Sequence, residues 1–201
     1  MDILKRIDLL LEEKDIDIDK ISKLIKRDCK KFLKESQKRP VYRGISERQF
    51  EFKKFKVRKD RKPTDMDISL HKDINTKFKE LHGVKNIRSV SLFGTGSIEH
   101  VERYGEAYYI FPIGNYTYWW SPKVVDLHDK LYFKNIYNID DIVPENKEWL
   151  NKLLKSYIDK DLPGAIKSGN EIMFLCDEYY AMDLNIYREV KDLILRKNRG
   201  A

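Results

Sequence analysis

Cysteine is scarce in this chain, and long apolar segments are missing from it. The sequence holds only two cysteines, Cys29 and Cys176, in 201 residues. Without a companion metal-binding or redox motif, they suit reduced thiols better than a disulfide scaffold. No apolar run approaches ~18 residues, and the N-terminus lacks the charged-then-apolar pattern of a signal peptide. The expected protein is therefore neither disulfide-rich nor membrane-spanning, and its expected location is the cytoplasm.

Histidine and glycine are also few, which bears on metal and dinucleotide sites. The four histidines are His71, His82, His100 and His128. None has a His or Cys partner at ligand spacing, so no metal site is expected. Gly94 and Gly96 suggest a dinucleotide-binding loop, but the third glycine position is Glu99 and no strand–helix–strand unit surrounds it. A Rossmann site is not expected.

Positive charge and aromatic side chains are plentiful. Forty Lys and Arg against 33 Asp and Glu give a net charge of +7, which favours acidic partners such as nucleic acid or nucleotides. The simpler alternative is a solvated, lysine-rich surface. Three Trp, twelve Tyr and nine Phe argue against disorder despite a charged fraction of 36%. One folded domain, with a helical appendage, fits the length.

Hydrophobic spacing predicts the elements of this domain. Helices are expected over residues 3–11, 18–32, 67–82, 98–105 and 142–158, and a helix or mixed segment over 187–195. Strands are expected over residues 41–45, 49–57, 89–91, 106–113, 116–120 and 171–176, and a loop over 161–170. Asp17 or Asp19 should cap the second helix, and Gly83 should end the third. Since helices and strands alternate without a βαβ rhythm, the predicted class is α+β, with residues 1–38 as an N-terminal helical region and 39–201 as the core.

Adjacent tryptophans stand in one predicted strand. Successive side chains of a strand point to opposite faces, so Trp119 and Trp120 cannot both face one core. One of them is expected to line a cleft or a partner surface. The neighbouring aromatics could form a stacking platform for bases, although filling a sheet core is the more ordinary role of period-two aromatics.

Three polar residues stand at the ends of predicted strands. Taken singly, Arg43, Ser89 and Glu171 are a strand arginine, a strand serine and a loop-edge glutamate. Taken in order, they form three short motifs: Tyr-Arg-Gly at 42–44, Ser-Val-Ser at 89–91, and a Glu that opens the apolar run 172–175. Together the motifs resemble the arginine–serine–glutamate class of ADP-ribosyltransferases, including phage-encoded hypothetical members, over residues 41 to 180.

The resemblance implies a fold, a substrate and a set of roles. It implies a split β-sandwich and mono-ADP-ribosylation of a macromolecule, with NAD as substrate. Glu171 would stabilise the oxocarbenium-like state in which the glycosidic C–N bond breaks. Arg43 would clamp the pyrophosphate, because a planar guanidinium meets phosphate oxygens with paired hydrogen bonds.

The remaining implied residues would hold the nicotinamide riboside. Gly44 would let the nicotinamide amide reach the backbone, and Ser89 or Ser91 would hold the ribose or orient Glu171. Phe93 or Tyr104 would stack on the nicotinamide ring. The implied cofactor-binding set is therefore Arg43, Gly44, Ser89, Ser91, Phe93 and Tyr104.

One position departs from the family and leaves the acceptor open. The family usually has Glu or Gln two residues before its catalytic Glu, and here that residue is Gly169. Arginine modification is therefore less expected, and nucleic acid ranks about level with protein as acceptor. The segment 161–170 is expected to touch the acceptor. The competing hypothesis is a basic nucleic-acid-binding or virion-associated protein with the same fold and no catalysis.

Overall fold

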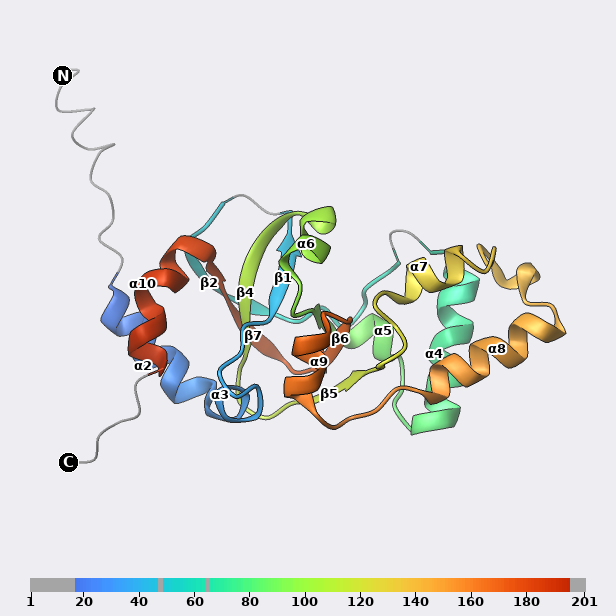
Figure 1. Ribbon diagram of the computed structural model, residues 1–201, viewed down its shortest axis with the longest axis horizontal. Coiled ribbons are helices and arrows are strands. Elements are labelled where there is room, and N and C mark those ends of the chain that lie inside the picture. The colour runs from blue at the N-terminus through green and yellow to red at the C-terminus, as the bar shows by residue number, and fades with distance from the viewer. Residues whose placement is uncertain (1–16, 47–48, 64–65, 196–201) are drawn as a thin grey trace, which may run out of the picture.

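The computed structural model describes residues 17–46, 49–63 and 66–195 (Figure 1). The helix expected over residues 3–11 lies outside them. The helices are α2 (Ile18–Asp28), α3 (Lys30–Glu35), α4 (Ile68–His82), α5 (Ile87–Val90), α6 (Ile98–Val101), α7 (Leu127–Tyr132), α8 (Pro144–Lys155), α9 (Leu162–Ser168) and α10 (Leu184–Leu195), with 3-10 turns η1 (Glu102–Tyr104) and η2 (Ile139–Asp141). The strands are β1 (Tyr42–Ile45), β2 (Phe52–Lys56), β3 (Leu92–Gly94), β4 (Glu106–Pro112), β5 (Thr117–Trp120), β6 (Ile172–Leu175) and β7 (Glu178–Asp183).

Two antiparallel sheets confirm the predicted α+β class. One has the strand order β1-β4-β7-β2 and the other β3-β6-β5. The sheets meet where the backbones of Tyr42 and Thr95 exchange two hydrogen bonds of 2.8 and 3.0 Å. This seam brings the start of β1 beside the end of β3.

The three-stranded sheet is covered on both faces. Ile172 and Phe174 of β6 pack into a first core, whereas the alternate residues Met173 and Leu175 pack into a second. This alternation explains the unbroken apolar run of β6, because a strand with two buried faces has no polar side.

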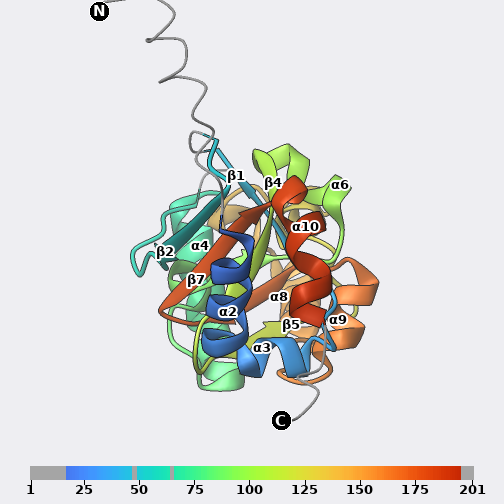
Figure 2. The same ribbon diagram turned by 90° about the vertical axis from the view of Figure 1, so that its left-hand side faces the viewer.

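Helices close the two ends of the elongated molecule. Figure 1 places α2, α3 and α10 at one end and α4, α7 and α8 at the other, with both sheets between them. Figure 2 shows α2 and α10 side by side in front of the four-stranded sheet. Ile21, Ile25 and Phe32 of the N-terminal helices are buried in the first core. The described part of this region therefore packs on the sheet.

The predicted helix signals hold at both capped ends. Asp17 accepts a hydrogen bond from Lys20 N at 2.8 Å and begins α2. Gly83, with φ of +74°, ends α4 in the left-handed conformation that favours glycine. The helix expected over residues 18–32 is interrupted at Cys29, whose ψ of 26° leaves helical geometry.

Two local predictions were wrong, and one strand was missed. Ser89 is helical, because Asn86 accepts hydrogen bonds from Ser89 N and Val90 N and closes the short helix α5; the strand begins only at Leu92. Residues 162–168, expected as a loop, form α9, which Asp161 caps by accepting from Gly164 N. Strand β7 was not predicted at all. None of the described helices combines the length and apolar character that crossing a membrane requires.

Candidate functional site

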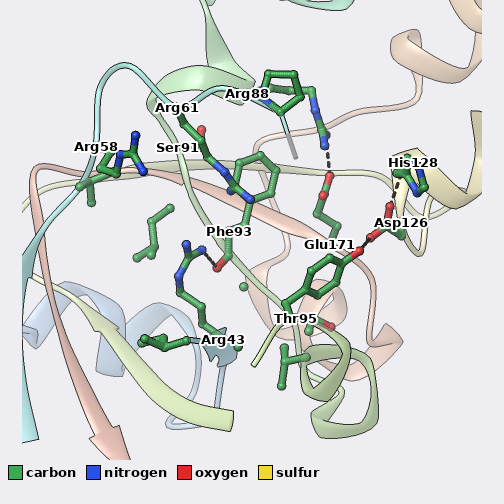
Figure 3. A pocket seen from close by; sticks show the side chains of 18 of the residues that line it. Arg43, Arg58, Arg61, Arg88, Ser91, Phe93, Thr95, Asp126, His128 and Glu171 are labelled. Carbon is green, nitrogen blue, oxygen red and sulfur yellow. Dashed lines mark hydrogen bonds and ion pairs between the residues drawn. The ribbon is translucent and has the colours of Figure 1, made fainter. Parts of the chain in front are cut away.

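A cavity of about 720 Å³ lies at the seam between the sheets. Its walls come from β1, β3, the end of β2, the loop after β2, the residues of α6 and η1, and the N-terminal edge of β6. Pockets of this size hold small-molecule ligands. Figure 3 shows Arg88 and Glu171 pointing toward each other across it, with Arg43 and Phe93 below.

Glu171 enters the cavity immediately before β6. Its backbone N donates to Val125 O at 2.8 Å, which fixes the carboxylate at the strand edge. The Glu171 Oε1 atom lies 2.9 Å from Arg88 Nη1, and the two side chains are only 11% and 12% exposed. Burial raises the pKa of Glu171, and the Arg88 guanidinium opposes that rise. The site therefore holds a buried carboxylate whose pKa lies above its ordinary value and whose charged form is stabilised by one neighbouring cation.

Arg43 and Gly44 lie on β1, on another wall of the same cavity. Arg43 Nη1 donates to Phe93 O at 2.9 Å, and burial lowers the pKa of this guanidinium. A Cβ built on Gly44 would lie 2.4 Å from Val101 O and 2.9 Å from Tyr104. Glycine is needed here because the turn η1 packs directly against the strand, a reason that the sequence alone did not reveal.

Two buried polar atoms of the cavity are unpaired. Neither Arg61 Nη1 nor Ser91 Oγ has a hydrogen-bond partner among the described residues. Ser91 is only 4% exposed, and burial with the nearby Arg43 and Arg88 lowers the pKa of Arg61 to about 10. A buried polar group without a hydrogen-bond partner costs on the order of 1–3 kcal/mol of folding free energy. Both atoms are placed to bind a polar ligand, and the Arg61 donor calls for an acceptor or an anion.

Phe93 is surrounded by cations. Its ring lies 4.5 Å from the Arg61 guanidinium carbon and 5.0 Å from that of Arg88. Cation–π contacts of this length stabilise and orient the guanidiniums. Because Phe93 already serves these two side chains, Tyr104, which is 44% exposed at the cavity rim, is better placed to stack on a ligand ring.

Ser89 lies behind the cavity wall. Its hydroxyl is 2.9 Å from His71 Nε2 and 3.3 Å from Asn75 Nδ2, and its carbonyl accepts from Arg61 N at 3.0 Å. Asn75 also accepts from Arg88 N at 3.0 Å. Ser89 therefore links α4 to the two segments that carry Arg61 and Arg88, and does not itself line the cavity.

The His71–Ser89 contact predicts a pH dependence of stability. Burial, with Arg88 and Arg61 nearby, lowers the pKa of His71 from 6.5 to about 4. Between these values the unfolded chain binds a proton that the folded chain does not, so the stabilisation is fully present above pH 6.5 and is lost as the pH falls toward 4. From about pH 7 to pH 4, we expect wild-type protein to lose about 2 kcal/mol more unfolding free energy than His71→Gln. Urea unfolding measures this, and parallel pH curves for the two proteins would contradict it.

A second polar group stands at the opposite rim. Asp126 Oδ2 accepts from Tyr104 Oη at 2.9 Å and lies 3.3 Å from His100 Nε2, while Oδ1 accepts from the backbone N atoms of His128 and Asp129. Asp126, His128 and Asp129 offer ligand atoms within 4.8 Å of one another. Both oxygens of Asp126 already accept hydrogen bonds, so we assign no metal to this group. Its hydrogen bond from Tyr104 holds that ring at the cavity rim.

Most of the residues singled out in the sequence share this cavity. Those that line it are Arg43, Gly44, Ser91, Phe93, Tyr104 and Glu171. Sequence reasoning missed Arg61, Arg88, His71 and Asp126 as site residues. Arg88 directly precedes the Ser-Val-Ser motif, which was a usable signal. Arg61 belongs to a charged run, and no sequence pattern distinguishes it from the other basic residues of that run.

Two expected contacts are absent from the cavity lining. Trp120 is 5% exposed and packs in the first core, whereas Trp119 packs against Phe78 and His82 in the second. Neither tryptophan therefore lines this cavity, and the expectation that one of them would lie on a partner surface stays a prediction for the half-buried Trp119. Helix α9 also stays outside the lining. Gly169 has a structural role of its own: with φ of +71° it ends α9, and its carbonyl accepts from Thr95 Oγ1.

Comparisons with family models, curated proteins and solved structures found no match.

Proposed function

We propose that the chain is an NAD-dependent mono-ADP-ribosyltransferase that modifies a macromolecular acceptor. One observation carries the proposal: a single cavity holds a buried carboxylate, Glu171, and a half-buried arginine, Arg61, whose buried Nη1 donor is unpaired. The carboxylate suits a positively charged ribosyl centre, and the guanidinium suits a pyrophosphate. NAD carries both groups, and the two antiparallel sheets are compatible with a split β-sandwich.

The residues suggest how NAD would lie. Arg43 and Arg61 would bind the pyrophosphate through charge-assisted hydrogen bonds. Ser91 Oγ, which lacks a partner, would hydrogen-bond the ribose next to the nicotinamide. Tyr104 would stack on the nicotinamide ring. Gly44 leaves β1 without a side chain at this wall, and Ser89 acts as a positioning residue through His71 and Arg61.

The reaction breaks one bond and forms one. The bond between ribose C1′ and the nicotinamide nitrogen breaks, and its electron pair leaves with neutral nicotinamide. Glu171 stabilises the positive charge that develops on the ribose, an electrostatic effect that is strong in a site shielded from water. A lone pair of the acceptor then bonds to C1′, and the acceptor's proton passes to water or to Glu171. With water as acceptor, the product is free ADP-ribose.

Arg61 provides a direct test of this assignment. Arg61→Gln is expected to weaken NAD binding about tenfold, because it removes a charge-assisted contact to the pyrophosphate. Calorimetric titration with NAD measures the change. The matched control is Arg188→Gln, which replaces an exposed arginine of α10 and should bind NAD as wild type does. Equal affinities for Arg61→Gln and wild type would remove Arg61 from the NAD site.

A second function remains on the same site. The excess of cations, and the engagement of Glu171 by Arg88, also suit an anion-binding protein without catalysis. Incubation with NAD labelled in the adenylate separates the two. Released nicotinamide and label on a macromolecule support the transferase. If NAD stays intact with every acceptor offered, the binding protein is the better assignment.

A further inference from the structure

The cavity carries more positive charge than a dinucleotide needs. The cations that line it are Arg43, Lys56, Arg58, Arg61, Lys62, Arg88 and Arg103. Among the residues that the structure describes, two carboxylates line it, and both are engaged: Glu171 by Arg88, and Asp126 by His100 and Tyr104. A pyrophosphate has two negative charges, which the inner arginines can bind. The outer cations are therefore available for a second anion.

Three of the outer cations lie in one short segment. Residues 53–62, here called the basic ribbon, hold seven Lys and Arg and a single Asp in a chain whose net charge is +7. Lys56, Arg58 and Lys62 are exposed and line the cavity. Lys56 and Lys62 form no ion pair with a described residue, and Arg58 has only a long contact, 3.7 Å, to the exposed Asp60.

The basic ribbon runs from the surface of the molecule toward the part of the cavity that holds Glu171. It begins in β2, one of the two edge strands of the four-stranded sheet, and continues into the loop that carries Arg61. Figure 3 shows Arg58 at the outer side of the cavity and Arg61 further in, toward Arg88. Lys54 and Lys59 of the ribbon pair with Glu178 and Asp177. The charge left over is thus concentrated at the cavity end.

We infer that the acceptor is single-stranded nucleic acid whose phosphates bind along the basic ribbon. A line of cations binds a sugar–phosphate backbone by releasing its counterions. Glu171 is buried, so only an unpaired base or a strand end can enter far enough to meet C1′ of the ribose, whereas a paired base cannot. The inference rests on the proposed function only for the statement that the bound strand accepts ADP-ribose. Binding itself needs no NAD.

The test compares two triple variants in binding a labelled oligonucleotide. The rim variant is Lys56→Ala/Arg58→Ala/Lys62→Ala, and the control is Lys147→Ala/Lys155→Ala/Lys191→Ala, at exposed lysines that do not line the cavity. Both lower the net charge by three. Fluorescence anisotropy with a mixed-sequence single strand of about 20 nucleotides, without NAD, gives affinity and its salt dependence.

If the strand binds at the cavity rim, the two triple variants should lose unequal amounts of binding affinity. We expect the rim variant to bind at least about tenfold more weakly and its log–log salt slope to become shallower by about 2, since each phosphate contact of a single strand contributes ~0.7. The control should stay within about twofold of wild type, and the same strand in duplex form should bind more weakly. Equal losses in both variants, or a preference for duplex, would overturn the inference.

Further measurements keep this inference apart from the proposed function. Nicotinamide release into water reports NAD cleavage without any strand. NAD cleavage with no strand binding overturns the nucleic-acid inference alone. The nucleic-acid inference is also overturned if label from NAD reaches protein but not the oligonucleotide, and if the rim variant transfers the label to protein as well as wild type does. Strand binding without NAD cleavage overturns the transferase and the acceptor role together.

Discussion

Replacing Glu171 by Gln is expected to lower the rate of nicotinamide release at least about a hundredfold. The substitution keeps the shape of the side chain and removes the charge that stabilises the ribosyl cation. Arg88, 12% exposed, would lose its charged partner, so the unfolding free energy should also fall by about 1–3 kcal/mol. Initial rates at saturating NAD measure the first effect, and urea unfolding the second.

Glu178→Gln is the matched control for this experiment. Glu178 pairs with Lys54 at 2.7 Å in a partly exposed position outside the cavity lining. The same chemical change there should leave nicotinamide release within about twofold of wild type, because exposed ion pairs contribute little. If Glu171→Gln folds and keeps the wild-type rate, Glu171 is not the residue that stabilises the ribosyl centre.

Gly96→Ala is expected to cost about 3 kcal/mol of unfolding free energy or more. A Cβ at this position would lie 1.8 Å from Ile166 O and 2.6 Å from its carbonyl carbon. These are backbone atoms of α9, so no side-chain rotation relieves the clash, and the segment that joins β3 to α6 has to move away from α9. Urea unfolding measures the loss.

Gly83→Ala separates this clash from the general effect of replacing glycine. Gly83 has φ of +74° and open space around its Cβ position, so its substitution should cost only about 1 kcal/mol. Thiol labelling gives a second measurement of the unfolding of each glycine variant, because unfolding exposes the two buried cysteines. Burial raises the pKa of Cys176 to about 12 and also raises that of Cys29, so both react slowly while the chain is folded. Equal stability losses for the two glycine variants would show that the contact with α9 is not tight.

The elements that the sequence predicted are those with strong local signals. Residues 68–82 show helical spacing, with Asp67 and Gly83 as local caps, and these need no tertiary information. The run Glu178–Asp183 carries weaker signals, since Asp177 and Asp183 bracket two tyrosines and a Met. It becomes a strand because β2 and β4 pair with it on either side. Pairing partners far away in sequence are invisible to periodicity.

The site shows the same division. Arg43, Ser89 and Glu171 were selected because each stands near the end of an apolar run. The structure brings Arg43 and Glu171 to one cavity, whereas Ser89 lies behind the cavity wall in a helical turn that the strand pattern did not reveal. Arg61 could not be selected, since its place depends on a backbone hydrogen bond to Ser89 and on the Phe93 ring. The packing of Trp119 against α4 could not be predicted either, because a strand pattern does not show which helix covers a sheet face.

The place of β7 in its sheet has a consequence for synthesis. β2 is hydrogen-bonded only to β7 among the described strands, and β7 follows it by more than a hundred positions in the chain. While the ribosome makes the intervening segment, Phe52 and Phe55 have no strand to pack on, and both edges of β2 are open to other chains. Nascent protein is therefore most prone to aggregate in this interval, and pausing of translation between β2 and β7 should increase its demand for chaperones.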